Sequence, residues 1–259
     1  MDAEWISRHA LSIWAVLLAT ALGAADVAWR RAVRRREGQD AAARALLRPA
    51  TTVAVAVAML AIAAAIAVEI RDAAGLATFD AALAAQLRAN MPEAALRMIA
   101  LLTHAGDALV LGVAAAAVFF VLLWRRHRRL AMAWIAALLG TALINAALKA
   151  WFRRERPPHD HGFIVEHSYS FPSGHASGSI VFYGMLAYVL LVLSPPRWHR
   201  AIVVAAVAMI TLVGISRILL QVHYFSDVLA GYATGLAWVT LCAGGAEYLR
   251  LREGRRAAS

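Results

Sequence analysis

The stretch D-A-L-V-L-G-V-A-A-A-A-V-F-F-V-L-L-W, residues 107–124, is eighteen residues long, and only the first of these is charged. A helix rises 1.5 Å per residue, so about 18 apolar residues are enough to cross a hydrocarbon core of about 30 Å. Residues 107–124 therefore predict a helix that spans a membrane.

Similar apolar runs recur on both sides of this stretch. Of the 259 residues, 62% are hydrophobic and 16% are charged, whereas a soluble domain is about 45–50% apolar and about 25% charged. The excess is spread along the whole chain, which predicts an all-α, polytopic transmembrane helix bundle. The expected spans are residues 10–29, 50–70, 107–124, 130–150, 176–194, 200–219 and 228–248.

The chain is strongly basic, with a formal net charge of +10 and Lys149 as its single lysine. A basic protein can bind nucleic acid. Here the arginines fall in short clusters between apolar runs, where membrane topology explains them, so we expect no nucleic-acid partner. The single cysteine, Cys242, lies in an apolar run and cannot form an intrachain disulfide.

The distribution of arginine predicts the orientation. Of the 26 basic residues, 17 lie in the loops 30–49 and 125–129, the turn 195–200 and the C-terminal tail. If seven spans alternate, all four segments share one side, which the excess of positive charge marks as cytoplasmic. The C-terminus is then cytoplasmic, and the acidic residues before the first span favour an uncleaved helix over a signal peptide.

On the opposite side we expect three segments that are not spans: residues 71–106, 151–175 and 220–227. Residues 78–100 predict a helix on the membrane interface that breaks near Pro92, with Asp80 off its apolar face. A lid or spacer without a chemical role explains the segment equally well. The apolar face would consist of Phe79, Leu83 and Leu87.

Three basic residues, Lys149, Arg156 and Arg217, fall near span ends on the side where topology disfavours fixed positive charge. Ionisable groups at membrane depth are costly and are usually functional. If these span ends converge, three cations could bind one phosphate dianion. The alternative is that the side chains extend to the interface, which explains Arg153 and Arg154 well.

The segment Pro172-Ser173-Gly174-His175 leads directly into the fifth span. The N-terminus of a helix offers free backbone N–H groups and favours an anion. Ser173 could add a hydroxyl donor, and His175 could transfer a proton to a leaving oxygen. An ordinary helix start, with Ser173 near the N-cap, explains the segment as well.

A second histidine, His223, is followed four residues later by Asp227. A carboxylate beside one imidazole nitrogen fixes the tautomer and makes the other nitrogen more nucleophilic. This pair at the mouth of a span indicates a nucleophile, although the spacing alone is frequent by chance.

Four other features carry weaker predictions. The run Thr103–Asp107 could line an entrance for substrate, but we favour helix capping by Asp107. Asn145 is expected to form a hydrogen bond between helices, and Gly231 with Gly235 is a possible close-approach motif. The histidine-rich loop at residues 159–167 has a metal-like composition but no evident geometry.

Together the three polar segments closely resemble the signature of the type 2 phosphatidic acid phosphatase superfamily: K-x6-R-P, P-S-G-H and S-R-x5-H-x3-D. Every motif position is present, and the resemblance covers about residues 50–248. It implies that residues 50–259 form a six-helix lipid phosphatase domain. Residues 1–49 would then be an added transmembrane helix with an Arg-rich cytoplasmic loop.

The resemblance also implies a role for each motif residue. His223 would attack phosphorus and become a phosphohistidine, Asp227 would orient it, and His175 would protonate the leaving group and then activate water. Family members typically need no metal, so we expect no metal ion and no cofactor. The residues expected to hold the phosphoryl oxygens are Lys149, Arg156, Ser173, Gly174 and Arg217.

A phosphorylated lipid in the bilayer is the implied substrate, with undecaprenyl diphosphate, phosphatidylglycerol phosphate, phosphatidic acid and a lipid A phosphate as candidates. The bias toward arginine suggests a bacterial origin, and hence an inner membrane with the site facing the periplasm. Two alternatives remain: a lipid phosphotransferase or headgroup transferase that uses the same site, and a non-catalytic lipid-binding membrane protein. The motifs do not predict an oligomeric state.

Overall fold

The computed structural model describes residues 3–36, 46–72, 75–159, 161–164, 166 and 168–258. Within these residues the chain forms α-helices and short 3-10 turns, and no strand. The α-helices are α1 (Ala3–Arg8), α2 (Ala10–Arg36), α3 (Pro49–Arg71), α4 (Gly75–Asn90), α5 (Glu93–Thr103), α6 (Ala108–Trp124), α7 (Arg128–Phe152), α8 (Gly174–Leu193), α9 (His199–Leu219) and α10 (Phe225–Ala258).

Seven candidate membrane spans are long and apolar enough to cross a bilayer. They coincide with the seven predicted runs, so the all-α transmembrane bundle is confirmed. The third candidate, Glu93–Trp124, is longer than predicted because α5 continues into α6 through a 3-10 turn at His104–Gly106.

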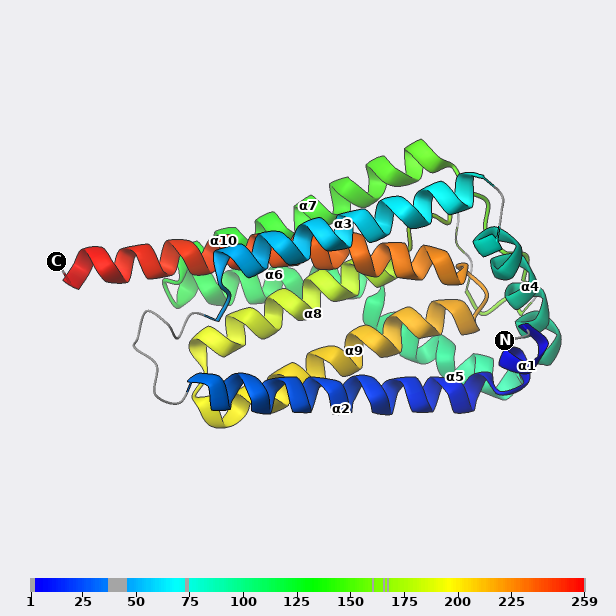
Figure 1. Cartoon of the computed structure of the whole chain (residues 1–259), viewed down its shortest axis with the longest axis horizontal. Helices are drawn as coiled ribbons and strands as arrows, with labels where there is room; N and C mark the ends of the chain where they lie inside the picture. The colour runs from blue at the N-terminus through cyan, green and yellow to red at the C-terminus, as the bar shows by residue number, and fades with distance from the viewer. Residues whose placement is uncertain are drawn as a thin grey trace.

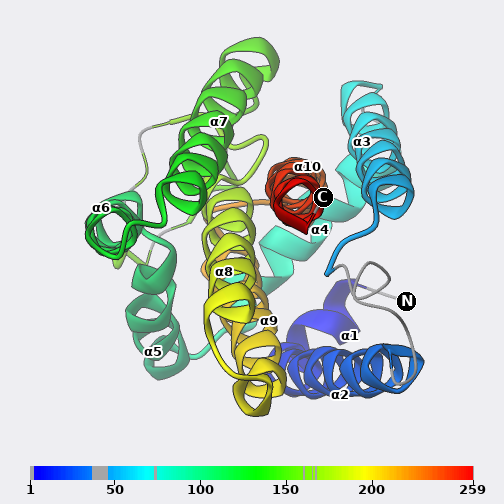
Figure 2. The ribbon, with the colours of Figure 1, turned by 90° about the vertical axis from the view of Figure 1, so that its left-hand side faces the viewer.

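Helices α8 and α10, which begin at the site, lie in the middle of the bundle. About half of the α8 and α10 spans is buried, 56% and 50%, more than in any other candidate span. Helix α10 packs against α3 and α8, and α8 also packs against α7 and α9. Helix α2 lies at the edge, mainly against α9 (Figure 2). The division at residue 49 stays a prediction.

The ends of the bundle differ in what they carry. The α6–α7 and α8–α9 turns and the C-terminus lie at one end (Figure 1). The segments that follow α7 and α9, together with α4 and α5, lie at the other end. The described parts of the Arg-rich segments are thus gathered at one end and the motif segments at the other, as alternation of the spans predicts.

Helices α4 and α5 meet at the predicted break, because α4 ends at Asn90 and Pro92 precedes α5. The prediction that Asp80 lies off the buried face of this segment is wrong. Asp80 is 1% exposed and forms one buried stripe with Leu83 and Leu87, since polar atoms of α10 satisfy its carboxylate.

Two glycines let α10 approach α8 very closely. A Cβ at Gly231 would lie 2.7 Å from the carbonyl oxygen of Ser173, and one at Gly235 would lie 2.2 Å from Ile180 Cγ2. The G-x-x-x-G pair is therefore a real helix contact. It sets the start of α10 beside the first turn of α8, where the Ser173 N–H donates to the Asp227 carbonyl at 3.0 Å.

Helix α7 is joined to the same region by Asn145. Its amide Nδ2 donates to Ser177 Oγ of α8 at 3.2 Å. The predicted interhelical hydrogen bond is thus confirmed, and it holds the last turns of α7, which carry Lys149, against the start of α8.

Candidate active site

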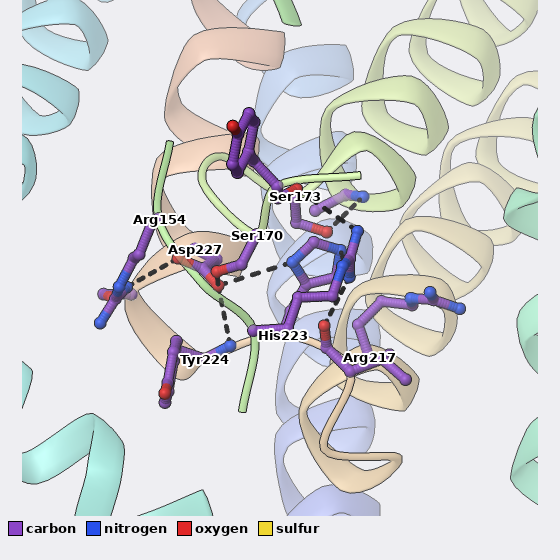
Figure 3. Close-up of polar contacts among 12 residues, drawn as sticks. Arg154, Ser170, Ser173, Arg217, His223, Tyr224 and Asp227 are labelled. Atoms are coloured by element: carbon purple, nitrogen blue, oxygen red, sulfur yellow. Dashed lines mark hydrogen bonds and ion pairs between the residues drawn. The ribbon is translucent and has the colours of Figure 1, made fainter. Parts of the chain in front are cut away.

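The three predicted motif segments converge at the end of the bundle that carries α4 and α5, and Figure 3 shows side chains from each of them, among them Arg154, Ser173 and His223. Lys149 lies in the last turn of α7, and Arg156 follows that helix. Ser173 is the N-cap of α8, and Gly174 and His175 are its first residues. Arg217 lies in the last turn of α9, His223 in the turn after it, and Asp227 in the first turn of α10.

His223 is positioned by the tight turn between α9 and α10. Gln221 in this turn has a φ of 51°, which reverses the chain, and the His223 side chain is 2% exposed. Arg156 Nη1 lies 3.0 Å from His223 Nε2. Because guanidinium can only donate, Nε2 must be the acceptor, and the proton of the neutral ring is on Nδ1.

The surroundings keep this imidazole uncharged. Burial, followed by the positive charges of Arg156, Arg217 and Lys149, lowers the pKa of His223 well below its ordinary value of 6.5. At neutral pH the ring therefore presents the lone pair of Nε2 toward the basic side chains.

Asp227 lies beside the other nitrogen of that ring. Its Oδ2 is 3.5 Å from His223 Nδ1, and Nδ1 is buried without a hydrogen-bond partner in the described residues. The same oxygen accepts hydrogen bonds from Ser170 Oγ at 2.6 Å and from the Tyr224 N–H at 2.9 Å. The carboxylate is thus held by other groups and faces the imidazole at a longer distance.

Arg154 holds the second oxygen of Asp227. Its Nη1 donates to Asp227 Oδ1 at 2.7 Å, and its Nη2 donates to Asp80 Oδ2 at 2.9 Å. The guanidinium lies 4.2 Å from the centre of the Tyr224 ring, and its side chain is only 15% exposed. The interpretation of Arg154 as a side chain extended to the interface is therefore wrong: it bridges two buried carboxylates.

His175 is also paired with a carboxylate. Its Nε2 lies 2.8 Å from Asp107 Oδ1, and the other oxygen of Asp107 lies 2.5 Å from His104 Nδ1. Asp107 is the N-cap residue of α6 but makes no side-chain capping hydrogen bond. The favoured interpretation of Asp107 as a helix cap is wrong, because its carboxylate is used by the two histidines.

The basic residues are held by short contacts. Lys149 Nζ donates to Ser168 Oγ at 2.8 Å and to the carbonyl of Tyr169 at 2.5 Å. Arg217 is 0% exposed; its Nη1 donates to Thr103 Oγ1 at 3.0 Å. Its Nε is buried without a partner in the described residues, so this guanidinium can still donate to an anion.

Ser173 and Gly174 form the start of α8 beside these cations. Ser173 Oγ accepts from the Ala176 N–H at 3.4 Å, as an N-cap does. A Cβ at Gly174 would lie 3.3 Å from Asn145 Oδ1, so the helix start is tightly enclosed. The helix-start interpretation is thus correct for Ser173, and it leaves the neighbouring N–H groups of the first turn available to an anion.

One acidic side chain that the motifs do not include reaches into this cluster. Glu166 accepts a hydrogen bond from Arg217 Nη2 through Oε1. Its Oε2 lies 3.5 Å from Arg156 Nη2, and its Oε1 lies 3.8 Å from His175 Nδ1. The carboxylate therefore contacts two of the basic residues and the second histidine at once.

His161, in the histidine-rich loop, makes its hydrogen bonds outside this cluster. His161 Nε2 donates to the carbonyl of Leu220 at 2.7 Å, and its Nδ1 accepts from the Phe163 N–H. In the part of the chain that the structure describes, no group of three or more His, Cys, Asp or Glu side chains is arranged so that it could hold a metal ion. Asp160 and His167 lie outside the described residues.

These features define a class: a polytopic membrane protein that holds a buried imidazole and converging basic side chains at one end of its helices. Residues 130–250 match the family model described as the PAP2 superfamily. This match agrees with the family that the three motifs predict, and all of the predicted site residues fall within the matched segment.

Two proteins with similar sequences are named as lipid phosphatases. Over 97 residues the chain is 40% identical to phosphatidylglycerophosphatase B of Bacillus subtilis (strain 168), covering 36% of this chain and 47% of that protein. Over 130 residues it is 32% identical to lipid A 1-phosphatase of Rhizobium johnstonii, covering 45% of this chain and 49% of that protein. The chain thus spans about half the length of these curated relatives.

A solved structure supports the same fold. The chain matches the crystal structure of the first transmembrane PAP2 type phosphatidylglycerolphosphate phosphatase from Bacillus subtilis with a TM-score of 0.62 and 28% sequence identity. The match covers 75% of this chain and 94% of that chain, which agrees with a shared helical core.

Proposed function

We propose that this protein is an integral membrane lipid phosphatase that hydrolyses a phosphomonoester or diphosphate headgroup through a phosphohistidine intermediate. The observation that carries the proposal is the state of His223: a buried, neutral imidazole whose Nε2 faces Arg156 Nη1 at 3.0 Å. A nucleophilic nitrogen beside a phosphate-binding guanidinium is the arrangement that in-line attack on phosphorus needs.

In the first step His223 Nε2 forms a bond to phosphorus while the bond from phosphorus to the leaving oxygen breaks. Asp227, 3.5 Å from Nδ1, stabilises the positive charge that the ring acquires. His175, in its protonated form, donates the Nδ1 proton to the leaving oxygen, since its Nε2 is occupied by Asp107. Arg156 and Arg217 neutralise the charge on the equatorial oxygens.

In the second step a water molecule attacks the phosphorus and the bond from phosphorus to His223 Nε2 breaks. The neutral His175 accepts the proton of this water on Nδ1, which restores its protonated form, and phosphate leaves. Three basic side chains supply the positive charge that divalent cations supply in other phosphoryl-transfer enzymes. We therefore propose that the reaction needs no metal.

The place of the candidate site supports a lipid substrate. It lies at the ends of membrane-spanning helices, where a lipid headgroup would lie. The names of the relatives, a phosphatidylglycerophosphatase and a lipid A 1-phosphatase, support phosphatidylglycerol phosphate and a lipid A phosphate as candidates. Phosphatidic acid and undecaprenyl diphosphate present the same terminal phosphate. We propose a bacterial inner membrane, with the site on the periplasmic side.

The test is release of inorganic phosphate by the purified protein from phosphorylated lipids in detergent micelles. We expect His223→Ala to reduce the rate by at least about 1,000-fold, because it removes the nucleophile. His127→Ala is the control and should keep full activity, because His127 lies in the α6–α7 turn, at the other end of the bundle from the candidate site. A chelator should have no effect.

Three outcomes would count against the proposal. Unchanged activity in His223→Ala would exclude the nucleophile, and loss of activity with a chelator would indicate a metal. A product in which an added alcohol carries the phosphoryl group, without free phosphate, would indicate a transferase. Trapping of an acid-labile phosphoenzyme in the unmodified protein, and its absence in His223→Ala, would support the covalent intermediate.

A further inference from the structure

The Glu166 carboxylate contacts the side chains that are proposed to bind and cleave the substrate phosphate. Its Oε1 accepts from Arg217 Nη2 and lies 3.8 Å from His175 Nδ1, and its Oε2 lies 3.5 Å from Arg156 Nη2. A tetrahedral phosphate in contact with the same nitrogens would need the same space. Glu166 and a bound phosphate therefore exclude each other.

The carboxylate carries a full charge in this position. Burial raises the pKa of Glu166, but the positive charges of Arg217 and Arg156 outweigh that effect and hold the pKa below its ordinary value. Without substrate, one negative charge thus neutralises part of the positive charge that Arg156, Arg217 and Lys149 supply.

The charge of the competing anion then decides whether it can replace Glu166. Phospholipids with a phosphodiester headgroup carry one negative charge on phosphate, as a carboxylate does. A phosphomonoester carries about 1.5 to 2 negative charges at neutral pH. Since Coulomb attraction scales with the charge, a diester gains little by replacing Glu166, whereas a terminal phosphate gains nearly twice the attraction.

We propose that Glu166 is a specificity-determining residue: an internal anion that keeps phosphodiester lipids out of the site and yields only to a terminal phosphate. Such discrimination matters in a membrane, because diester headgroups surround the site at the same depth and in large excess. The proposal deepens the phosphatase function and rests on it. It uses a repulsive element against the wrong ligand, as specific binding sites often do.

The experiment compares Glu166→Gln with the unmodified protein, and uses Glu155→Gln as the control. Glu155 precedes Arg156 in the same segment, is exposed and carries the same charge. The substrate is phosphatidic acid, and the inhibitor is phosphatidylmethanol with the same acyl chains, which differs only by a methyl ester on phosphate. Initial rates are measured in mixed micelles at increasing mole fractions of the diester.

We expect Glu166→Gln to be inhibited at roughly tenfold lower mole fractions of phosphatidylmethanol than the unmodified protein, since tenfold corresponds to the loss of about 1.4 kcal/mol of competition. Its KM for phosphatidic acid should also fall. Glu155→Gln should behave as the unmodified protein does. Equal inhibition of Glu166→Gln and the unmodified protein would overturn the proposal.

A second measurement separates this idea from the phosphatase function. The binding of orthovanadate can be measured without turnover, from the rise in the thermal unfolding temperature that it causes. Glu166→Gln should bind orthovanadate roughly tenfold more tightly than the unmodified protein does. If neither protein releases phosphate, the proposed function fails, while tighter vanadate binding still supports the role of Glu166. A fall in kcat with unchanged inhibition and unchanged vanadate binding would make Glu166 a catalytic residue and overturn the proposal. Glu166→Ala provides the same comparison if the glutamine variant does not fold.

Discussion

At the scale of single residues, the site contains two histidines that differ in their carboxylate partners. His223 accepts from Arg156 at Nε2, so its proton faces Asp227. His175 donates from Nε2 to Asp107, so its Nδ1 faces Glu166 and the basic residues. The partners thus fix opposite tautomers, which suits one ring to attack phosphorus and the other to exchange a proton.

This pairing predicts the effect of Asp107→Asn. The amide no longer carries the charge that stabilises protonated His175, and it can donate instead of accept, which disturbs the tautomer. We expect kcat to fall on the order of 100-fold, the contribution of one general acid, with KM nearly unchanged. The pH profile of kcat should lose the limb that reports protonated His175.

Asp72→Asn is the control for this prediction, because Asp72 is exposed after α3 and should tolerate the change. The measurement is steady-state kinetics on one lipid across pH. A variant that keeps the kcat and the pH profile of the unmodified protein would show that Asp107 does not position His175.

At the scale of the elements, the site depends on the close contact between α8 and α10. Gly231 and Gly235 bring the α10 backbone onto the first turns of α8, and Arg154 ties the segment after α7 to Asp80 of α4 and Asp227 of α10. The nucleophile, the proton donor and the basic residues come from different elements. Their distances are therefore set by helix packing.

Gly235→Leu should separate these two helices. A Cβ at this position would already lie 2.2 Å from Ile180 Cγ2 and 2.9 Å from the Ser177 carbonyl, and overpacking costs about 1–3 kcal/mol or more. We expect a lower thermal unfolding temperature in detergent. We also expect a loss of activity larger than the fraction of unfolded protein accounts for.

Gly112→Leu on α6 is the matched control, because a Cβ there would meet no atom within 4 Å. It should leave both the unfolding temperature and the activity close to those of the unmodified protein. Equal effects of the two substitutions would show that the α8–α10 contact does not set the site geometry.

At the scale of the whole molecule, the bundle separates its charges by end. The α6–α7 turn, with Arg125 and Arg126, and the start of α7, with Arg128 and Arg129, lie at the end opposite the candidate site. Because positive loops are retained in the cytoplasm, this separation supports a site that faces away from the cytoplasm.

A pair of fusions tests that orientation. A reporter joined after Arg129 should be active only in a cytoplasmic form, and one inserted near His161 only in an exported form. The readout is a pair of enzymes, one active on each side of the membrane. The reverse pattern would place the site in the cytoplasm and exclude a periplasmic substrate.

Much of this protein was determined by the sequence itself. The length and apolar character of seven runs predict seven spans, since a bilayer requires about 18 apolar residues whatever the helix packs against. The three motifs, read in order, predict the family. Because His175, Arg217 and His223 all fall at span ends on the same side of the membrane, the sequence also predicts that they lie close together.

Only the tertiary structure revealed the partners of those residues. Asp107, Arg154 and Glu166 lie in segments whose local pattern indicates a helix cap, an interfacial arginine and a polar loop, and Asp80 lies on a face that periodicity marks as exposed. Their roles come from contacts between residues more than fifty positions apart, such as Asp107 with His175 and Arg217 with Glu166. Local patterns of hydrophobicity and capping cannot encode such contacts, because they arise only when the packing of helices brings distant charges into one buried space.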